Sequence, residues 1–444
     1  MKTPICDFVK KYIKSGTLRL HMPGHKGKRH FGMEKYDLTE MYGADSLFEA
    51  DGIIAESEKN ASELFGADTF YSAEGSSLCI RAMLFLASLY AKEKNEELCV
   101  LAARNVHKTF LSAAALLDFD IEWLWQDENE GYLSCKITGE KLEKALSRVD
   151  KKVTCVYITS PDYLGNICDI KSVSEVCRKY GILLLVDNAH GAYLKFLKSS
   201  MHPMDLGADM CCDSAHKTLT ALTGGAYLHI SKKAEDVFKN NARDALCMFA
   251  STSPSYLILQ SLDYINGYVD EKYKKRLNAF LDLADEYKSR LAEYGYTFEG
   301  GERLKYTVNV KEFGYTGTEF ADILRKNHKI ECEFSDADYV VLMLSCDNKD
   351  LKKVYKALLK IPKRETNLKG NTAITRAERI ISPRTAMLGA REEISVDFAE
   401  GRILAAPSVS CPPAVPILMP GEKIDKEAIK AFNYYGIKTV KVVK

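Results

Sequence analysis

Short apolar runs alternate with longer amphipathic stretches through the first half of the chain. The apolar runs lie at 99–103, 153–159, 182–187 and 210–214, and each has the length of a strand. Their residues do not alternate strictly between apolar and polar, as expected for strands that helices cover on both faces. The pattern therefore predicts an α/β fold built on a mostly parallel sheet.

Helical spacing of apolar residues predicts the helices between these strands. One helix is expected at 56–65, where Gly66 ends it, and a long helical region is expected at 254–294. That region would carry the chain out of the large domain. The alternating segments YTVNVKEF and YVVLMLS follow it, with helices between them, and predict a smaller α/β domain.

The end of the chain has a different character from the rest. Residues 363–375 are polar and predict a linker, and the tail after them is rich in proline, which demands extended, irregular backbone. We expect four parts. They are an N-terminal arm at 1–50, a large domain at 51–270, a small α/β domain at 271–370 and a C-terminal domain at 371–444.

Composition excludes few functions, but it bears on which partners and which cellular location to expect. The chain has 444 residues, of which 46% are hydrophobic and 28% charged, and its net charge is +1. This balance gives no electrostatic reason to expect nucleic acid or an anionic membrane as a partner. The apolar runs are much shorter than a membrane span of about 20 residues, and the N-terminus has no signal-peptide pattern.

The thirteen cysteines are scattered, odd in number and without a CxxC pair. This spacing favours reduced thiols in a cytoplasmic protein over a disulfide framework or a metal site. His21 and His25 lie four residues apart, but the Met-Pro-Gly between them prevents a helix that would place both on one face. We therefore predict no bound metal.

The candidate chemistry begins with Asp187, which ends an apolar run, and Lys217, thirty residues later in the polar loop DSAHKTL. A lysine amine can hold the aldehyde of pyridoxal 5′-phosphate (PLP) as a Schiff base. A carboxylate can keep the pyridine nitrogen of that cofactor protonated. A single lysine is generally a surface residue and a single aspartate at a strand end is commonly a helix cap, so the pair carries the hypothesis.

A phosphate site is predicted at Gly75-Ser76-Ser77, between the strand-like TFYS and an apolar helix. Free backbone amides and the positive end of the helix dipole favour an anion there, and Gly75 permits close approach of the backbone. Ser214 is placed to add a contact. A plain serine N-cap remains the alternative.

Three further positions fit a planar cofactor. His107 follows the strand-like run 99–103, so its ring could lie flat against the cofactor, although a structural histidine is the alternative. The small Ala189, between Asn188 and His190, leaves room for a ring. His216 adjoins Lys217, and a second positive charge there would lower the pKa of the lysine.

The chain resembles the bacterial-type ornithine/lysine/arginine decarboxylases over essentially its whole length. These are fold type I PLP enzymes with the aspartate aminotransferase fold, and the resemblance implies a seven-stranded, mostly parallel sheet plus a smaller C-terminal α/β domain. The motifs that carry it are HMPGHKG, GADSLFEADGIIAESE, FGADTFYSAEGSS, RNVHKTF, TSPDYLGNICDI, VDNAHGAY, DSAHKTL, STSP and the tail GRILAAP to CPPAVPILMPGE.

The resemblance also implies residue roles. Lys217 would be the Schiff-base lysine, Asp187 the partner of the pyridinium, His107 the ring-stacking residue and His216 a proton donor after CO2 leaves. The implied cofactor-binding residues are Gly75, Ser76, Ser77, His107, Asp187, Ala189, His190, Ser214 and Lys217. Thr252 and Ser253 would reach the phosphate of a neighbouring subunit in an obligatory homodimer, whether or not the dimer belongs to a higher oligomer.

The implied reaction is α-decarboxylation of arginine, lysine or ornithine to agmatine, cadaverine or putrescine and CO2, as in polyamine biosynthesis. Aminotransfer on the same fold, or a non-catalytic binding relative, are the alternatives. An aminotransferase would need an arginine for the substrate α-carboxylate, and the candidates are Arg376, Arg379, Arg384 and Arg402. Candidate partners for a basic head group are Asp45, Glu49, Asp51 and Asp397.

Two features separate the chain from members of that family. It resembles their short form, which lacks the response-regulator-like N-terminal domain of the large enterobacterial members. It also has Cys411 and Ala414 where relatives commonly carry tyrosine and glycine. The departure in the tail bears on the substrate pocket more than on the PLP chemistry.

Overall fold

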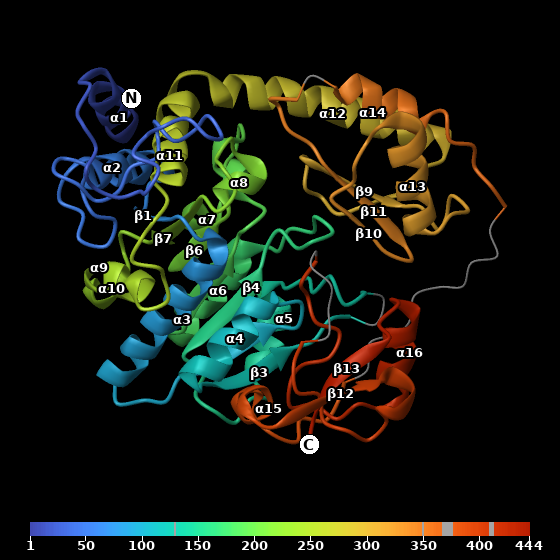
Figure 1. The fold of residues 1–444 in the computed structure, drawn as a ribbon. Helices are drawn as coiled ribbons and strands as arrows, with labels where there is room; N and C mark the ends of the chain where they lie inside the picture. Colours follow the sequence, from blue (N-terminus) through green and yellow to red (C-terminus); the bar gives the residue numbers. More distant parts are fainter. Residues whose placement is uncertain (128–129, 349, 366–375, 408–412) are drawn as a thin grey trace. The chain divides into compact units, whose positions relative to one another are not determined.

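A computed structural model describes residues 1–127, 130–348, 350–365, 376–407 and 413–444 (Figure 1). The chain divides into two compact units, and neither is continuous in sequence. The first comprises Met1–Val100, Leu146–Tyr157 and Ile170–Leu277; the second comprises Leu101–Ala145, Ile158–Asp169 and Asn278–Lys444. No helix in the described ranges is long and apolar enough to cross a membrane.

The main sheet has seven strands in the order β1-β7-β6-β5-β4-β2-β3. Strands β5 and β6 are parallel, with Asp187 opposite Cys212, whereas β7 is antiparallel to both β6 and β1. The predicted fold class is confirmed. Its strands are β1 (Asp68–Ser72), β2 (Cys99–Ala103), β3 (Asp120–Leu124), β4 (Cys155–Thr159), β5 (Leu183–Asp187), β6 (Met210–Asp213) and β7 (Ala226–Ile230).

Burial explains why these strands read as continuous apolar runs. Every residue of β2, β5, β6 and β7 is buried, as expected for strands that helices cover on both faces. The helices of this half of the chain are α1 (Pro4–Lys14), α2 (Ile53–Phe65), α3 (Gly75–Glu93), α4 (Lys108–Leu117), α5 (Gly139–Leu146), α6 (Ile170–Tyr180), α7 (Pro203–Leu206), α8 (Ala215–Thr218), α9 (Asp236–Asn240) and α10 (Ala242–Cys247), with the 3-10 turn η1 (Ala192–Phe196).

The predicted helical region 254–294 is not one regular helix. Helix α11 (Tyr256–Tyr268) passes into the π-helical turn η2 (Val269–Tyr273), and α12 (Lys274–Tyr294) continues from there. A π turn inserts an extra residue into the helical ladder and so changes the direction in which later side chains point. Apolar spacing alone does not reveal such a turn.

The second unit contains two small sheets. One has four antiparallel strands in the order β10-β11-β9-β8, and the other pairs β12 with β13. A hydrophobic core that includes Leu404, Phe432 and Val442 packs the C-terminal part. The remaining elements are β8 (Phe298–Glu299), β9 (Lys305–Asn309), α13 (Gly317–His328), β10 (Phe334–Ser335), β11 (Tyr339–Met343), α14 (Leu351–Leu358), α15 (Pro383–Leu388), β12 (Arg391–Ser395), η3 (Val396–Phe398), α16 (Lys426–Tyr434) and β13 (Thr439–Val443).

The cysteines fit the expectation of reduced thiols. No disulfide joins the twelve that lie in the described residues, and eight of them are buried. Cys411 and most of the predicted linker 363–375 lie outside the described residues. The buried cysteines act as small apolar side chains in the core.

Candidate active site

Asp187 is the last residue of β5, and its side chain is buried. One carboxylate oxygen, Oδ1, accepts hydrogen bonds from the backbone N–H of Ala189 at 3.2 Å and from the Cys212 thiol at 3.6 Å. The other, Oδ2, accepts from the Tyr157 hydroxyl at 3.3 Å. The strand end, the turn after it and two neighbouring strands therefore fix this carboxylate in place.

Electrostatics make the Asp187 carboxylate receptive to a cation. Burial raises its pKa, while the positive charge of Lys217 and the hydrogen bonds from Ala189, Cys212 and Tyr157 act in the opposite direction. A buried carboxylate that is incompletely compensated gains stability from a protonated ring nitrogen placed against it. This is the environment that a pyridinium partner requires.

Lys217 lies in the short helix α8, whose N-cap is Ser214. Its Nζ is 3.1 Å from Nε2 of His190, which is buried and follows Asp187 by three residues. The turn after β5 thus carries both the carboxylate and the imidazole that contacts the amine. His216 instead directs Nδ1 to the carbonyl oxygen of Gly225 at 3.0 Å, so that ring nitrogen donates a hydrogen bond to the backbone.

The predicted phosphate site forms where two loops meet. Gly75 begins α3 with a φ of +75°, and a Cβ added there would meet no described atom within 4 Å. The hydroxyl of Ser214, from the loop before α8, lies 2.8 Å from that of Ser76. Gly75 also donates its N–H to the carbonyl of Gly224 at 2.7 Å. Open space, two hydroxyls and a helix N-terminus fit a phosphate group.

Thr252 and Ser253 are exposed to solvent. The loop that holds them is tied to the phosphate site of its own chain, because Ser251 donates its N–H to the Glu74 carboxylate at 2.7 Å. Glu74 is the N-cap of α3. Their predicted contact with a neighbouring subunit stays a prediction.

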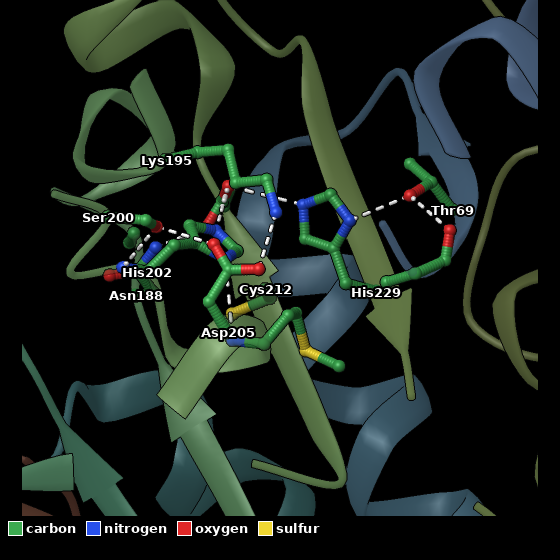
Figure 2. A network of polar contacts seen from close by, with 12 residues as sticks. Thr69, Asn188, Lys195, Ser200, His202, Asp205, Cys212 and His229 are labelled. Carbon is green, nitrogen blue, oxygen red and sulfur yellow. Dashed lines mark hydrogen bonds and ion pairs between the residues drawn. The ribbon is translucent and has the colours of Figure 1, made fainter. Parts of the chain in front are cut away.

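A buried polar network that the sequence reasoning missed lies next to these loops (Figure 2). Its centre is Asp213, the last residue of β6, which accepts hydrogen bonds from Asn188 Nδ2 at 2.6 Å, His202 Nε2 at 3.0 Å and His229 Nε2 at 3.1 Å. Thr69 Oγ1 lies 2.9 Å from His229 Nδ1. The strand-end rule that singled out Asp187 applies equally to Asp213 on the neighbouring strand.

The network sets the charge of its members. Burial opposes ionisation of Asp213, but the contacts with His202 and His229 hold its pKa well below the usual range. Burial also lowers the pKa of His229. His202, Cys211 and Asp213 are close enough to hold a metal ion. A metal ion there would bind the Asp213 carboxylate, which hydrogen bonds from His202, His229 and Asn188 already stabilise.

His107 lies in the second unit and caps helix α4. Its Nδ1 accepts a hydrogen bond from the N–H of Thr109 at 3.2 Å and lies 2.8 Å from the Thr109 hydroxyl. These contacts place the second ring nitrogen, Nε2, as the protonated one. The stacking role of His107 stays a prediction.

Three of the four candidate arginines for a substrate carboxylate have contacts of their own within the second unit. Arg379 donates to the carbonyl of Ile121 at 2.8 Å, and Arg384 donates to that of Ala115 at 3.0 Å. Arg402 pairs with Glu392 at 2.7 Å. The fourth, Arg376, lies 5.6 Å from the ring centre of Trp125.

Asp45, a candidate partner for a basic head group, has a structural role. Its carboxylate accepts backbone N–H groups of Ser46, Gly52 and Ile54 at 2.8–2.9 Å, closing the loop before α2. Burial acts against ionisation, but these donors bring the pKa of Asp45 below its usual value. Glu49, Asp51 and Asp397 are exposed.

Comparison with known proteins agrees with this geometry. Residues 3–299 match the model for the Orn/Lys/Arg decarboxylase major domain, and residues 374–440 match that for the Orn/Lys/Arg decarboxylase C-terminal domain. The chain belongs to this family. It is therefore a PLP-dependent amino acid decarboxylase.

Two curated relatives cover nearly the whole chain. An arginine decarboxylase of Bacillus subtilis is 28% identical, and the match covers 96% of this chain and 92% of the relative. An arginine decarboxylase of Halalkalibacterium halodurans is also 28% identical, with 95% and 91% covered.

Solved structures share the fold. Lysine decarboxylase A from Pseudomonas aeruginosa matches with a TM-score of 0.79 and 16% identity, over 99% of this chain and 80% of that one. The constitutive lysine decarboxylase of E. coli matches with a TM-score of 0.75 and 17% identity, over 100% and 82%. At these identities the match concerns the fold alone.

Proposed function

We propose that this protein decarboxylates a basic amino acid at its α-carbon, with arginine as the preferred substrate, giving agmatine and CO2. The observation that carries the proposal is the pairing of a buried carboxylate, Asp187, with the amine of Lys217 through the turn that holds His190. The names of the two similar arginine decarboxylases favour arginine among the three basic amino acids.

The residues of the first unit divide the work of holding the cofactor. Gly75, Ser76 and Ser214 would hold its phosphate, and Lys217 would hold its aldehyde carbon. Asp187 would keep a proton on the ring nitrogen. Bound PLP supplies a positively charged ring that accepts the electron pair left when CO2 departs.

His190 and Lys217 would then manage protons at the reacting carbon. An imidazole within hydrogen-bond distance of the amine can take or return a proton as the amine is displaced and restored. His216, the alternative proton donor, adjoins Lys217 in sequence but makes its described contact with the backbone of Gly225. Both histidines remain in the proposal, and the contact of His190 with the amine supports His190.

Purified protein reconstituted with PLP and offered L-arginine, L-lysine and L-ornithine separately tests the proposed reaction. We expect CO2 and agmatine, with kcat/KM for arginine exceeding that for the other two. If cadaverine or putrescine is the preferred product, the preferred substrate is lysine or ornithine, and the proposed decarboxylation still holds. Formation of a keto acid without release of CO2 would support aminotransfer instead. Failure of the protein to bind PLP would refute the proposal that it is a PLP-dependent enzyme.

The contacts of the arginines bear on aminotransfer. An aminotransferase needs an arginine whose guanidinium meets the substrate α-carboxylate. Arg379, Arg384 and Arg402 already donate to backbone carbonyls or to Glu392. A decarboxylase gains from leaving that carboxylate without a strong cationic partner, because such a partner stabilises the ground state.

We also propose a homodimer in which each subunit completes the other's site. Large apolar side chains of the N-terminal arm are exposed, including Leu20 at 82% and Phe31 at 96%, and Thr252 and Ser253 face solvent. Exposed apolar surface of this kind marks an interaction site.

Subunit mixing tests this arrangement. Lys217→Ala subunits and Thr252→Ala/Ser253→Ala subunits are mixed after separate purification. If Thr252 and Ser253 serve the partner's site, each mixed dimer has one intact site and about a quarter of wild-type activity returns. If they serve their own site, mixing restores nothing.

A further inference from the structure

Arg104, which follows β2, is one of the most deeply buried charged side chains of the chain, with 1% exposed. Its Nη2 donates to the Glu422 carboxylate at 2.6 Å, and the carboxylate is equally buried. The indole rings of Trp123 and Trp125 flank the guanidinium, with centres at 5.1 and 4.6 Å. Among the described residues, Nε and Nη1 have no hydrogen-bond partner. Glu422 therefore supplies the counter-charge for this cation.

Glu422 is itself fixed by the turn that contains it. Its carboxylate accepts the N–H of Met419 at 2.8 Å, and its backbone carbonyl accepts the N–H of Leu404 at 2.9 Å. Arg104 is fixed in turn, because its N–H donates to Leu124 on β3 at 3.0 Å. The ion pair thus links two rigid backbones that are 318 residues apart in sequence.

A second contact from the same tail segment lies just beyond His107. Lys108 begins α4 and donates its N–H to the carbonyl of Ala414 at 2.8 Å. Ala414 has a φ of +58°, which turns the backbone sharply at this point. Residues 104 and 108, which bracket His107, are therefore both held by residues of the segment 414–422.

The side chain between these anchors does not fix the loop by itself. Asn105 is 1% exposed, and neither its amide nitrogen nor its amide oxygen has a hydrogen-bond partner within the described ranges. Nδ1 of His107 contacts Thr109, inside its own helix. The contacts that hold residues 104 and 108 therefore contribute to the position of the imidazole between them.

We infer that the C-terminal segment 414–422 sets the position of His107, with Glu422 and Arg104 as positioning residues for the cofactor site. This inference rests on the proposed function and on the predicted stacking of the His107 imidazole against the PLP ring. The C-terminal domain would then be a working part of the active site.

Glu422→Gln tests the ion pair with little change of shape. Glu392→Gln is the matched control, because Glu392 pairs with Arg402 in the same C-terminal domain but is 42% exposed. We expect Glu422→Gln to weaken PLP binding about tenfold and to change the visible circular dichroism of the bound cofactor. The control should leave both unchanged. Wild-type affinity and circular dichroism in Glu422→Gln would overturn the inference.

A double-mutant cycle with His107→Ala separates positioning from general damage to the fold. If Glu422 acts through His107, the tenfold cost of Glu422→Gln should fall to about twofold or less in the His107→Ala background. An equal cost in both backgrounds would mean that the ion pair only stabilises the fold. Thermal unfolding of the cofactor-free variants monitors that stability separately.

Lys108→Pro supplies an independent test, which still applies if the Glu422→Gln variant does not fold. Proline is favoured at the first position of a helix, and His107, with φ −66° and ψ 146°, already has the conformation required before proline. The change removes the N–H that reaches Ala414. We expect about fivefold weaker PLP binding, and unchanged binding would count against the inference. If the wild type itself fails to bind PLP, the proposed function fails first, which distinguishes the two outcomes.

Discussion

The amine of Lys217 lies 3.1 Å from Nε2 of His190, and His190 sits on the same turn as the buried carboxylate of Asp187. One short segment, 187–190, therefore supplies both the carboxylate that would face the cofactor ring and an imidazole that contacts the lysine amine. Two functional groups on one turn move together, so their spacing is insensitive to small shifts elsewhere.

Covalent attachment to Lys217 is the first expected outcome. Borohydride reduction of PLP-loaded protein, followed by peptide mass spectrometry, should locate a pyridoxyl group on Lys217. Lys217→Ala should carry none and lose visible absorbance and activity. A modified lysine elsewhere, with Lys217 unmodified, would refute the assignment.

His190→Ala should lower kcat/KM for arginine about 100-fold, because it removes the imidazole that contacts the amine. His216→Ala serves as the comparison. If loss of His216 has the larger effect and loss of His190 is nearly silent, His216 is the proton-transfer residue. The cofactor absorbance of both variants shows whether the effect lies in binding or in turnover.

Tyr157→Phe should alter the pH dependence of activity. The Tyr157 hydroxyl donates to Asp187 and favours the carboxylate form, so its removal raises the pKa of Asp187 further. The acidic side of the kcat/KM profile should move to higher pH, with little change on the alkaline side.

Tyr227→Phe is the matched control for that profile. The Tyr227 hydroxyl is buried and, in the described part of the chain, has no hydrogen-bond partner. Its removal should leave the profile in place. A profile of Tyr157→Phe that coincides with wild type would show that this hydroxyl does not tune Asp187.

Ser76→Ala and Ser214→Ala should each weaken PLP binding about five- to tenfold. Their hydroxyls lie 2.8 Å apart, so each orients the other. The double variant should therefore lose less than the sum of the two single free-energy changes. Ser289→Ala, on an exposed helix face, is the control for loss of a serine hydroxyl. Strict additivity would argue against a shared site.

Asp213→Asn should destabilise the protein by about 3 kcal/mol, because two histidine donors lose a charged acceptor in a fully buried setting. PLP affinity should fall with it, since Asn188 adjoins Asp187 and bonds to Asp213. Asp205→Asn breaks the partly exposed pair with Lys195 and should cost at most about 1 kcal/mol. Chemical unfolding of both variants decides whether the network of Figure 2 is structural.

The sequence predicts those elements that appear in it as an uninterrupted run of apolar residues. The buried strands β2, β5 and β6 read as apolar runs, and the ends of those strands pointed to Asp187. Strand β3 was missed because it is only partly buried and so does not form an apolar run. The π turn within 254–294 leaves no mark in apolar spacing.

Contacts between distant residues could not be predicted in this way. Arg104 and Glu422 are ordinary charged residues in sequence, and only folding buries them together. Asp45 was predicted as a partner for a basic head group, but backbone N–H groups use its carboxylate. The left-handed backbone of Ala414 supplies a physical reason for glycine at that place, since glycine adopts a positive φ without a steric cost.

The long separation between Arg104 and Glu422 also bears on how the chain is made. During translation the guanidinium emerges more than three hundred residues before its counter-ion. A nascent chain whose ribosome has not yet reached the tail cannot bury that charge at low cost. The final packing around the end of β2 is therefore delayed until residue 422 has been synthesised, and a chain terminated before that point would leave the end of β2 open to chaperones and proteases.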